Sequence, residues 1–590
     1  MLKRFCCTVL IVAMLMSLCA CGADTPLTQE NSLPSVSDDA DGSHYMPDLS
    51  SAISVRLKDN GSSADGDGVL IDGNIITVTK AGCYVFSGNL SNGQLRVETT
   101  DNAAVTLVLS GVTVHNDCTA PLFVRKAENV LLTLADGTQN TFSDGADRVY
   151  EDEENQEPSG TIFSKSDLVL GGEGTLCVNA AFADGIVSRD GLTVESGNIT
   201  VRAADDALMG RDYVRVIDGV LNLEAAGDGI KSTNDTDHTV GFVAIDGGRL
   251  TVTSGKDGIQ SQSTLSVDGG EINVVAGGGY RNGTPHGQGG FGYTATAQTE
   301  SLGKGLKAGT VLSLSGGKVS VDAADDALHS NQSFMMSGGD VTVAAGDDGA
   351  HADTELTVAN GNLTVTNSYE GLESATVIIE GGNVSVTASD DGVNASSGNN
   401  ETGDDRGMPQ NPFMSDDSAF YIRGGTVCIN AQGDGLDSNG IVDMTGGDVI
   451  VIGPESNGNG TFDFGASFSV SGGKLVAIGS NGMASAPTSN TMNSIQWGGF
   501  SMNCGDQLTV TDSDGNVIAE VSALRNTSWM YVTCEELVTG EEVAVTCGSA
   551  SQSFIIKEGG NIEGAVGGFG GPGGGGHPPD GFGGRPARPW

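Results

Sequence analysis

The sequence has 590 residues, of which 90 are glycine and 15 are proline, with 5% aromatic residues and a formal net charge of −47. A chain this acidic repels nucleic acid and anionic membranes, so the composition excludes both as binding partners and favours cations. The glycine-rich composition continues along nearly the whole chain without a break, which favours one repetitive domain over several globular ones.

The first 20 residues predict a signal peptide that is not part of the fold. A short basic start precedes an apolar run over residues 5–19, which is shorter than the roughly 20 residues of a membrane span. The residues that lead into Cys21 resemble a bacterial lipoprotein signal. The resemblance implies cleavage before Cys21 and acylation of that cysteine, so that the lipid anchors the protein at the extracellular face of the cell membrane. An ordinary secretory signal and an uncleaved anchor are the alternatives.

The segment that follows the signal peptide predicts a tether. Residues 21–50 are rich in Ser, Asp, Thr and Pro and lack apolar periodicity, so we expect a flexible linker. Residues 51–180 are rich in predicted strands without a strict period, and we assign them to the first coils of the domain.

An internal repeat governs the chain from about residue 184. Its motif reads acid, Gly or Ala, apolar, polar, small, and most copies are 21 or 22 residues apart. A step of 29 residues and a step of 47 contain insertions, the longer at residues 277–303; a step of 43 is two coils, or one coil with an insertion near residues 398–418. The first positions of the motif are Asp184, Asp206, Asp228, Asp257, Lys304, Asp326, Asp348, Glu370, Asp391 and Asp434.

A second marker keeps the same period out of phase with the acid motif. It is mostly the second glycine of a Gly-Gly pair, as at Gly248 and Gly270. Short alternating segments between the markers, such as Leu250-Thr251-Val252, predict strands with one apolar and one polar face. Three such strands per coil predict a parallel β-helix over residues 51–480. The apolar motif residues should stack inward, among them Ile230, Ile259, Leu328 and Leu372.

The end of the chain predicts a cap and a tail. Residues 481–557 should form a small β cap on the β-helix, with Asp514-Gly515 as a hairpin turn. Residues 558–590 are glycine-rich with proline, so we expect a disordered tail.

The eleven cysteines show no zinc-ligand spacing and no disulfide framework. A disulfide stays open among three late cysteines, Cys504, Cys534 and Cys547.

Three separated segments carry a resemblance to a known family: Leu132–Gly145, Ile162–Leu176 and Ala226–Ser232. Together they resemble the clostridial-type carbohydrate-binding domain family, over roughly residues 70–450. The resemblance implies a right-handed parallel β-helix that binds calcium and polysaccharide, either cellulose-like or acidic uronate glycans. It also implies a fold similar to pectate lyases. Lys304 departs from the pattern because it replaces the motif acid, which weakens the case for calcium at that coil.

The repeated acids predict cation binding. Strands of adjacent coils lie about 4.8 Å apart, and two carboxylates at that separation repel by roughly 3 kcal/mol at an effective dielectric of 20. Calcium relieves such repulsion because it takes six to eight oxygen ligands. The alternative is that each Asp-Gly pair only caps a turn, with glycine supplying a positive φ. The candidate calcium ligands are Asp205, Asp206, Asp228, Asp325, Asp326, Asp347, Asp348, Asp390 and Asp391.

The polar residue three places after the motif acid should point outward. His329 and His351 are expected to stack on adjacent coils as solvated side chains, with a metal pair or a sugar contact as alternatives. Lys231 and Lys307 occupy the same position and are weak candidates for a general base, since charge balance is the commoner role of such lysines. The candidate carbohydrate-binding aromatic residues lie in the long insertion and are Tyr280, Phe291 and Tyr293.

The sequence therefore favours a surface protein that binds calcium and polysaccharide without catalysis. Two other functional classes stay open. One is a polysaccharide lyase that acts on uronate chains with calcium and a lysine base, which unsaturated products from polygalacturonate would reveal. The other is an adhesin or wall-associated structural protein, which wall binding without glycan specificity would reveal.

Overall fold

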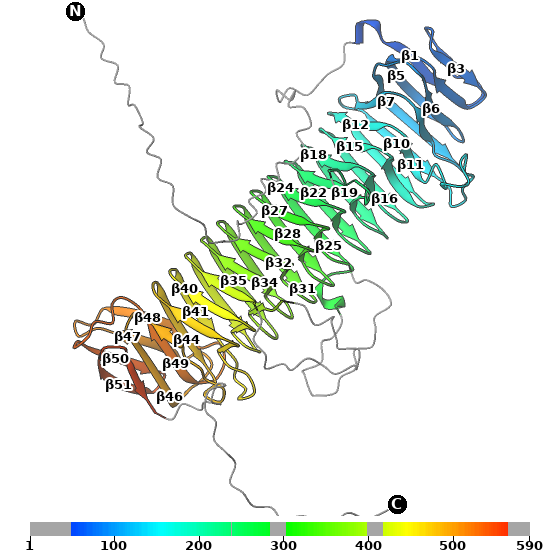
Figure 1. The fold of residues 1–590 in the computed structure, drawn as a ribbon. Coiled ribbons are helices and arrows are strands. Elements are labelled where there is room, and N and C mark those ends of the chain that lie inside the picture. Colours follow the sequence, from blue (N-terminus) through cyan, green and yellow to red (C-terminus); the bar gives the residue numbers. More distant parts are fainter. Residues whose placement is uncertain (1–48, 238, 284–302, 398–416, 565–590) are drawn as a thin grey trace, which may run out of the picture. The chain divides into compact units, whose positions relative to one another are not determined.

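The computed structural model describes residues 49–237, 239–283, 303–397 and 417–564, and Figure 1 shows their arrangement. These residues form strands and two short 3-10 turns, η1 (Leu49–Ser51) and η2 (Tyr280–Asn282), and none of them is in an α-helix. No helix in these ranges is long and apolar enough to cross a membrane. The predicted signal peptide, Cys21, most of the linker and the tail beyond residue 564 lie outside the described residues.

The chain folds as the predicted parallel β-helix, in which each coil contributes one strand to each of three parallel sheets, A, B and C. In the coils that carry the acid motif, the motif forms the turn that leads from sheet C into sheet A, and the A strand begins at Asp184 in the first of these coils and two residues after the motif position in the later ones. Sheet A contains β4 (Ile75–Val78), β6 (Gln94–Glu98), β8 (Leu122–Lys126), β11 (Gly160–Ser164), β14 (Asp184–Ser188), β17 (Leu208–Gly210), β20 (Ile230–Ser232), β23 (Ile259–Ser261), β26 (Leu306–Ala308), β29 (Leu328–Ser330), the first halves of β32 (Ala350–Val358) and β34 (Leu372–Ile379), β36 (Val393–Ala395), β39 (Leu436–Ser438) and β42 (Phe462–Phe464).

Sheet B follows sheet A within each coil. Its strands are β1 (Ile53–Leu57), β5 (Gly82–Leu90), β7 (Val105–Asn116), β9 (Asn129–Leu134), β12 (Asp167–Gly172), β15 (Gly191–Val194), β18 (Tyr213–Val216), β21 (Phe242–Ile245), β24 (Thr264–Val267), β27 (Val311–Leu314), β30 (Ser333–Met336), the second halves of β32 and β34, β37 (Ala419–Ile422), β40 (Ile441–Met444), β43 (Ser467–Val470) and β45 (Ser489–Asn490).

Sheet C completes the coil after the glycine turn. It contains the ends of β5 and β7, then β10 (Gln139–Asp144), β13 (Thr175–Ala180), β16 (Asn198–Ala203), β19 (Val220–Ala225), β22 (Arg249–Ser254), β25 (Glu271–Ala276), β28 (Lys318–Ala323), β31 (Asp340–Ala345), β33 (Asn362–Asn367), β35 (Asn383–Ala388), β38 (Thr426–Ala431), β41 (Asp448–Ile452) and β44 (Lys474–Gly479). Figure 1 shows these strands side by side in chain order, from β16 to β44.

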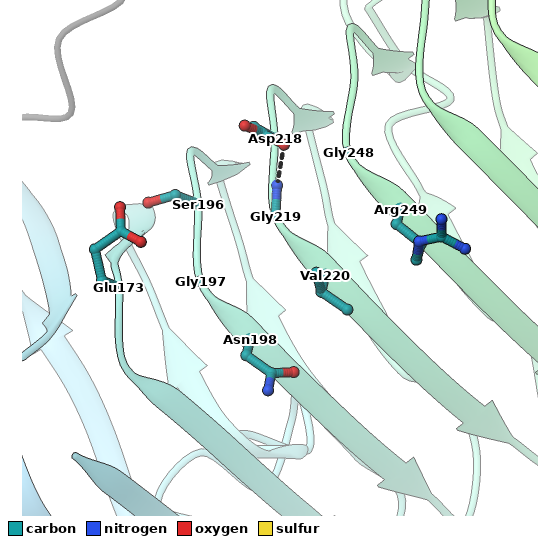
Figure 2. A pocket seen from close by; sticks show the side chains of 9 residues that line it. All are labelled: Glu173, Ser196, Gly197, Asn198, Asp218, Gly219, Val220, Gly248 and Arg249. Carbon is teal, nitrogen blue, oxygen red and sulfur yellow. Dashed lines mark hydrogen bonds between the residues drawn. The ribbon is translucent and has the colours of Figure 1, made fainter. Parts of the chain in front are cut away.

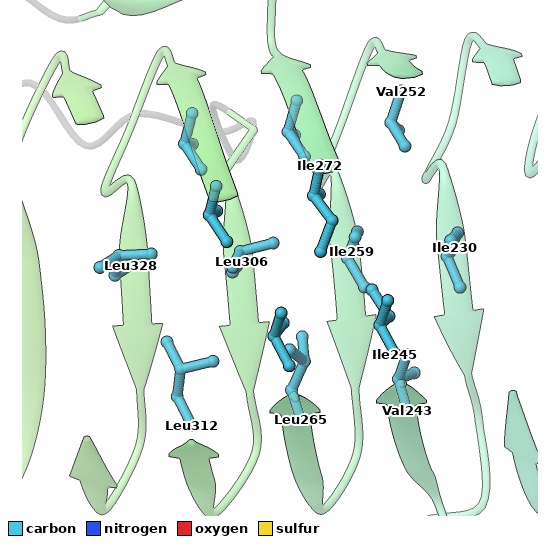
Figure 3. Close-up of a cluster of buried hydrophobic side chains, with 14 of the residues drawn as sticks. Ile230, Val243, Ile245, Val252, Ile259, Leu265, Ile272, Leu306, Leu312 and Leu328 are labelled. Carbon is cyan, nitrogen blue, oxygen red and sulfur yellow. The ribbon is translucent and has the colours of Figure 1, made fainter. Parts of the chain in front are cut away.

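The core consists of rows of apolar side chains that run from coil to coil. Ile230 pairs in register with Ile259, Ile259 with Leu306, and Leu306 with Leu328. All four side chains are fully buried, and Figure 3 shows them stacked inside the β-helix. The predicted inward orientation of the motif's apolar residue is therefore confirmed, and burial of these rows is what holds neighbouring coils together.

The two glycine markers serve different purposes. Gly317, in the turn between sheets B and C, has a φ of +79°, and a Cβ there would lie 2.8 Å from the carbonyl oxygen of Gly269. Gly229, in the acid motif, has no positive φ, and a Cβ would lie 2.2 Å from Cγ1 of Val252. The positive φ that the turn-capping alternative assigned to the motif glycine is therefore absent at Gly229. Its role is to leave room for the side chain that packs against it.

The insertions leave the coil count unchanged. β36 pairs directly with β39, so the step of 43 residues is one coil with an insertion, whose residues 398–416 lie outside the described structure. β23 likewise pairs directly with β26 across the longer insertion. Neighbouring coils therefore stay in register on both sides of each excursion.

Antiparallel strands cover both ends of the β-helix. At the first coils, β1 pairs with β2 (Ser63–Ala64), and β3 (Val69–Asp72) pairs with β4. At the last coil, β49 (Thr527–Thr533) pairs antiparallel with β44 and with β46 (Ser494–Met502). Antiparallel pairing at the ends blocks further coil addition by another chain.

The predicted β cap is confirmed as a second small core at the C-terminal end. Its separate sheet has the strand order β48 (Val517–Ser522), β47 (Gln507–Thr511), β50 (Glu542–Cys547), β51 (Ala550–Ile555). Asp514-Gly515 lies in the hairpin between β47 and β48. β52 (Asn561–Glu563) pairs with β46 and lies inside the segment that the sequence assigned to the tail. Cys504, Cys534 and Cys547 are free thiols.

Candidate functional site

The motif acids form one continuous row along the turn between sheets C and A, which we call the acid row. Each acid lies two residues before the buried apolar residue that anchors the next A strand, so the packing of the core fixes its position. Most of its aspartates are buried, with no more than 5% of the residue exposed at Asp184, Asp206, Asp228, Asp257, Asp326 and Asp348.

The first carboxylate oxygen of these acids links one coil to the next. Oδ1 of Asp206 accepts a hydrogen bond of 2.7 Å from the backbone N–H of Asp228, whose own Oδ1 accepts one of 2.9 Å from Asp257. The same contact recurs from Lys304 N–H to Asp257 and from Asp434 N–H to Asp391. The aspartates therefore bond the backbone of the following coil rather than their own turn. A hydrogen bond to the charged form of a carboxylate favours that form and offsets part of the cost of burial.

Lysine side chains neutralise the second oxygen in the middle of the row. Nζ of Lys231 lies 2.6 Å from Oδ2 of Asp228 and 3.4 Å from Oδ2 of Asp206. Burial alone would lower the pKa of Lys231, but the bond to Asp228 and the attraction of Asp206 outweigh it and raise the pKa above its ordinary value. Nζ of Lys307 lies 2.8 Å from Oδ2 of Asp257. Lys231 thus holds its proton more firmly than a free lysine, the opposite of what a general base requires.

Lys304 likewise places an ammonium group beside carboxylates, where a metal ion would otherwise be needed to balance the charge. Its Nζ contacts Oδ1 of Asp325 at 3.1 Å and Oδ2 of Asp326 at 2.5 Å. Burial alone would lower the pKa of Lys304, but the attraction of the two aspartates raises it. The acids Asp325, Asp326 and Asp347 do come together, with oxygens within 4.8 Å of one another. The ammonium of Lys304 therefore lies where it balances the charge of this group.

The two histidines continue the neutralised region. Their rings are stacked with centroids 5.0 Å apart and planes 10° apart, as predicted for adjacent coils. Nδ1 of His329 lies 2.8 Å from Oδ2 of Asp326, and Nδ1 of His351 lies 2.7 Å from Oε2 of Glu373. Burial would lower the pKa of His351, but hydrogen bonds to Asp348 and Glu373 raise it to about 11. The expectation of solvated histidines is wrong, because only 13% and 22% of these side chains is exposed.

The C-terminal part of the row has a different electrostatic character. Asp391, Asp434 and Asp437 place carboxylate oxygens within 4.8 Å of one another. Burial, and next the repulsion from Asp434 and Asp437, raises the pKa of Asp391 to about 9. Burial, with repulsion from Asp463 and Asp390, raises the pKa of Asp434 to about 7. The neighbours that shift Asp391 most are thus other carboxylates, which is the arrangement that a divalent cation relieves.

Glu370 continues this pattern one coil before Asp391. Burial, and then repulsion from Glu373, raises the pKa of Glu370 to about 8. Asp348, Glu370 and Glu373 also hold oxygens within 4.8 Å of one another. The charge of the outward position changes along sheet A, from lysine through histidine to glutamate, as the register of Lys307, His329, His351 and Glu373 shows.

The structure regroups the predicted calcium ligands. Asp205 and Asp206 gather with Asp184, which the sequence did not select. Asp228 pairs with Lys231 instead of joining a carboxylate group. Asp326 and Asp348 group with His351. Asp391 groups with two acids from the next coil, Asp434 and Asp437, and not with the predicted Asp390.

Of the three predicted aromatic residues, the structure describes only Tyr280, since Phe291 and Tyr293 lie outside the described residues. The backbone N–H of Tyr280 donates a 2.6 Å hydrogen bond to Oδ1 of Asp322. The guanidinium of Arg281 lies 5.5 Å from the centroid of the Tyr280 ring. The start of the long insertion is thus held against the edge of sheet C.

A groove of about 500 Å³ follows the glycine turns between sheets B and C. Figure 2 shows that Gly197, Gly219 and Gly248 lie along its floor, with Asn198 and Arg249 at the start of the adjoining C strands. Because the floor has no side chains, a bound molecule can approach the backbone closely while polar side chains contact its edge.

Comparison with known proteins places the chain in a family. The family model described as carbohydrate-binding domain-containing protein matches residues 72–349 and 347–533. The chain belongs to this family. A family member from Acetivibrio thermocellus (strain ATCC 27405), described as a carbohydrate-binding domain-containing protein, is 37% identical over 137 residues, which is 23% of this chain and 48% of the relative. The chain thus matches about half the length of that curated relative.

A solved structure also matches part of this family member. It is the polysaccharide lyase-like protein from C. thermocellum, a gadolinium derivative, with 33% sequence identity and a TM-score of 0.38. The match covers 38% of this chain and 92% of the solved chain.

Proposed function

We propose that the protein is a cell-surface lipoprotein that binds polysaccharide through a calcium-loaded β-helix, without a catalytic step. Membership of the carbohydrate-binding domain family supports polysaccharide as the ligand class. The proposed glycans are cellulose-like chains or acidic uronate chains. A uronate polymer approaching a chain with net charge −47 is repelled, and bound calcium offsets that repulsion by bridging carboxylates.

The observation that carries the calcium proposal is the group formed by Asp391, Asp434 and Asp437, whose oxygens lie within 4.8 Å of one another. Three carboxylates offer up to six oxygens, and calcium accepts six to eight from carboxylates, backbone carbonyls and water. The raised pKa values of Asp391 and Asp434 support the same conclusion, because a divalent cation lets both groups ionise in a buried place.

The proposed localisation rests on the sequence around Cys21. Acylation of that cysteine after signal cleavage would tether the β-helix outside the membrane, with residues 22–50 as the linker.

The calcium site is tested by titration calorimetry on the wild type and on the Asp391→Asn/Asp434→Asn variant. The matched control is Asp257→Asn, which removes a carboxylate from the same turn position, where Lys307 already neutralises it at 2.8 Å. We expect the double variant to lose one bound ion and the control to keep it. An unchanged ion count in the double variant contradicts calcium at this group. Polysaccharide retention measured in parallel tests the function, which fails if the wild type binds no glycan with calcium present.

A further inference from the structure

The outer surface of sheet C carries a column of uncharged side chains that form hydrogen bonds. Thr251 shows the arrangement, because it points outward between the buried residues Leu250 and Val252. The equivalent residue pairs in register from coil to coil across eight successive strands. The eight residues are Thr200, Asn222, Thr251, Asn273, Ser320, Thr342, Thr364 and Ser385.

Strand formation alone does not demand this composition. An outward position of a strand faces water and admits charged residues, as Arg249 and Glu271 in a neighbouring column show. The chain contains 75 acidic residues, yet none of them enters the column. Beyond the eight coils the column continues with Cys177 at one end and Cys428 at the other. The uncharged hydrogen-bonding composition is therefore confined to one continuous block of coils.

The columns on either side of this block are close to electrically neutral. Arg202 Nε lies 3.0 Å from Glu224 Oε2 on the next coil, and Arg249 forms an ion pair with Glu271 in the same way. Over the same coils the charged residues of the two flanking columns comprise three cations and four anions, namely Arg202, Arg249, Lys318, Glu224, Glu271, Asp322 and Asp340. The face thus has a net charge of only −1 in a protein whose net charge is −47.

A hollow borders the face on each side. The groove of about 500 Å³ over the glycine turns reaches the flanking column that contains Asn198 and Arg249. On the opposite side a second groove, of about 710 Å³, reaches the flanking column that contains Arg202 and Glu224, and alanines at the ends of the C strands and in the C-to-A turns form its floor. Both grooves run across several coils, so a long ligand on the face has room at its two edges.

We propose that this face, from β16 to β35, is the glycan-binding surface, and that its ligand is an uncharged polysaccharide chain that crosses successive coils. The inference rests on the proposed polysaccharide-binding function and adds the surface and the charge class. Hydroxyl and amide side chains both donate and accept hydrogen bonds, as sugar hydroxyls do. A near-neutral face spares an uncharged chain the repulsion that a uronate chain meets.

Because the column repeats along the coils, one glycan chain can form many weak hydrogen bonds at once. A single hydrogen bond contributes only about 0.5–1.5 kcal/mol, so one coil does not retain a sugar chain in water. Coils that recur about every 4.8 Å offer a hydroxyl or amide side chain repeatedly to one polymer, and linked contacts raise the overall affinity far above that of each contact. Retention should therefore grow with the length of the glycan.

The test compares retention of the full chain on insoluble cellulose and on polygalacturonate. Thr251→Glu/Thr342→Glu places two charges in the column, and Thr251→Val/Thr342→Val removes only the two hydroxyl groups. The matched control, Ser313→Glu/Met335→Glu, places the same charges at outward positions of sheet B, in β27 and β30. Melting curves of all variants confirm that the coils remain folded.

We expect at least tenfold weaker retention on cellulose for the Glu pair, several-fold weaker retention for the Val pair, and wild-type retention for the control. If both column variants bind cellulose as the wild type does, the face is not the binding surface, while the proposed function stands. Wild-type retention on polygalacturonate alone likewise overturns the inference and leaves the function intact. A wild type that binds neither polymer overturns both.

Discussion

From the raised pKa values of Asp391 and Asp434 in the C-terminal part of the acid row, we expect the calcium-free protein to lose stability as pH rises. Burial, and next repulsion from Asp434, raises the pKa of Asp391 to about 9, and burial raises that of Asp434 to about 7. Both groups titrate near 3.9 in an unfolded chain, by the ordinary value for aspartate. A carboxyl whose pKa is raised in the folded state contributes its full stability below about pH 4 and loses it as pH approaches the folded value.

The expected magnitude follows from these values. Each group lowers the free energy of unfolding by about 1.4 kcal/mol per pH unit while the pH lies between its unfolded and folded pKa. The fall in the free energy of unfolding that is due to Asp434 ends near pH 7, and the fall that is due to Asp391 ends near pH 9. Calcium at one hundred times its dissociation constant adds back about 2.7 kcal/mol.

The assay is urea unfolding of the wild type and of Asp391→Asn/Asp434→Asn between about pH 5 and pH 9, in chelator and in calcium. The variant keeps the side-chain size but cannot ionise, so its stability in chelator should fall less steeply with pH than that of the wild type. Calcium should flatten the wild-type profile and leave the variant unchanged. Equal pH slopes of the two proteins in chelator would refute the reasoning.

Three further predictions concern the core, the lysine in the acid row and the anchor. Leu328→Asp buries an unpaired carboxylate at a cost of several kcal/mol, so a melting curve identical to wild type would contradict the inward register. Lys304→Met removes the cation that bonds Asp325 and Asp326, so we expect a lower melting temperature in chelator and a larger rise on adding calcium; a smaller rise would count against lysine as a substitute for an ion. Cys21→Ser should abolish lipid labelling and release the protein from the membrane fraction, and persistent membrane attachment would disprove lipidation at that residue.

The β-helix could be predicted from the sequence because its determinant is one-dimensional. A period of 22 residues places Leu306 and Leu328 at the same point of adjacent coils, and in-register stacking of identical positions needs no further information. The antiparallel pairing at the N-terminal end was not predictable in this way. Residues 53–78 carry no period, so nothing in their pattern distinguishes antiparallel from parallel pairing.

The grouping of the acids was only partly predictable. Spacing places Asp391 and Asp434 in one row, but it does not say which oxygens meet, because that depends on side-chain torsions and on the outward residue of the neighbouring coil. The role of Lys304 shows the limit, since a residue that breaks the motif turns out to balance the charge of Asp325 and Asp326. The column through Thr251 had a readable signal, a hydroxyl or amide residue at the centre of each apolar-polar-apolar strand.

The most direct test of the account is retention of the intact protein on immobilised polysaccharides, neutral and acidic, in calcium and in chelator. The account predicts retention on at least one polysaccharide in calcium, with weaker retention and a lower melting temperature in chelator. Absence of retention on every polysaccharide in calcium, by a protein whose melting curve shows that it is folded, would contradict it.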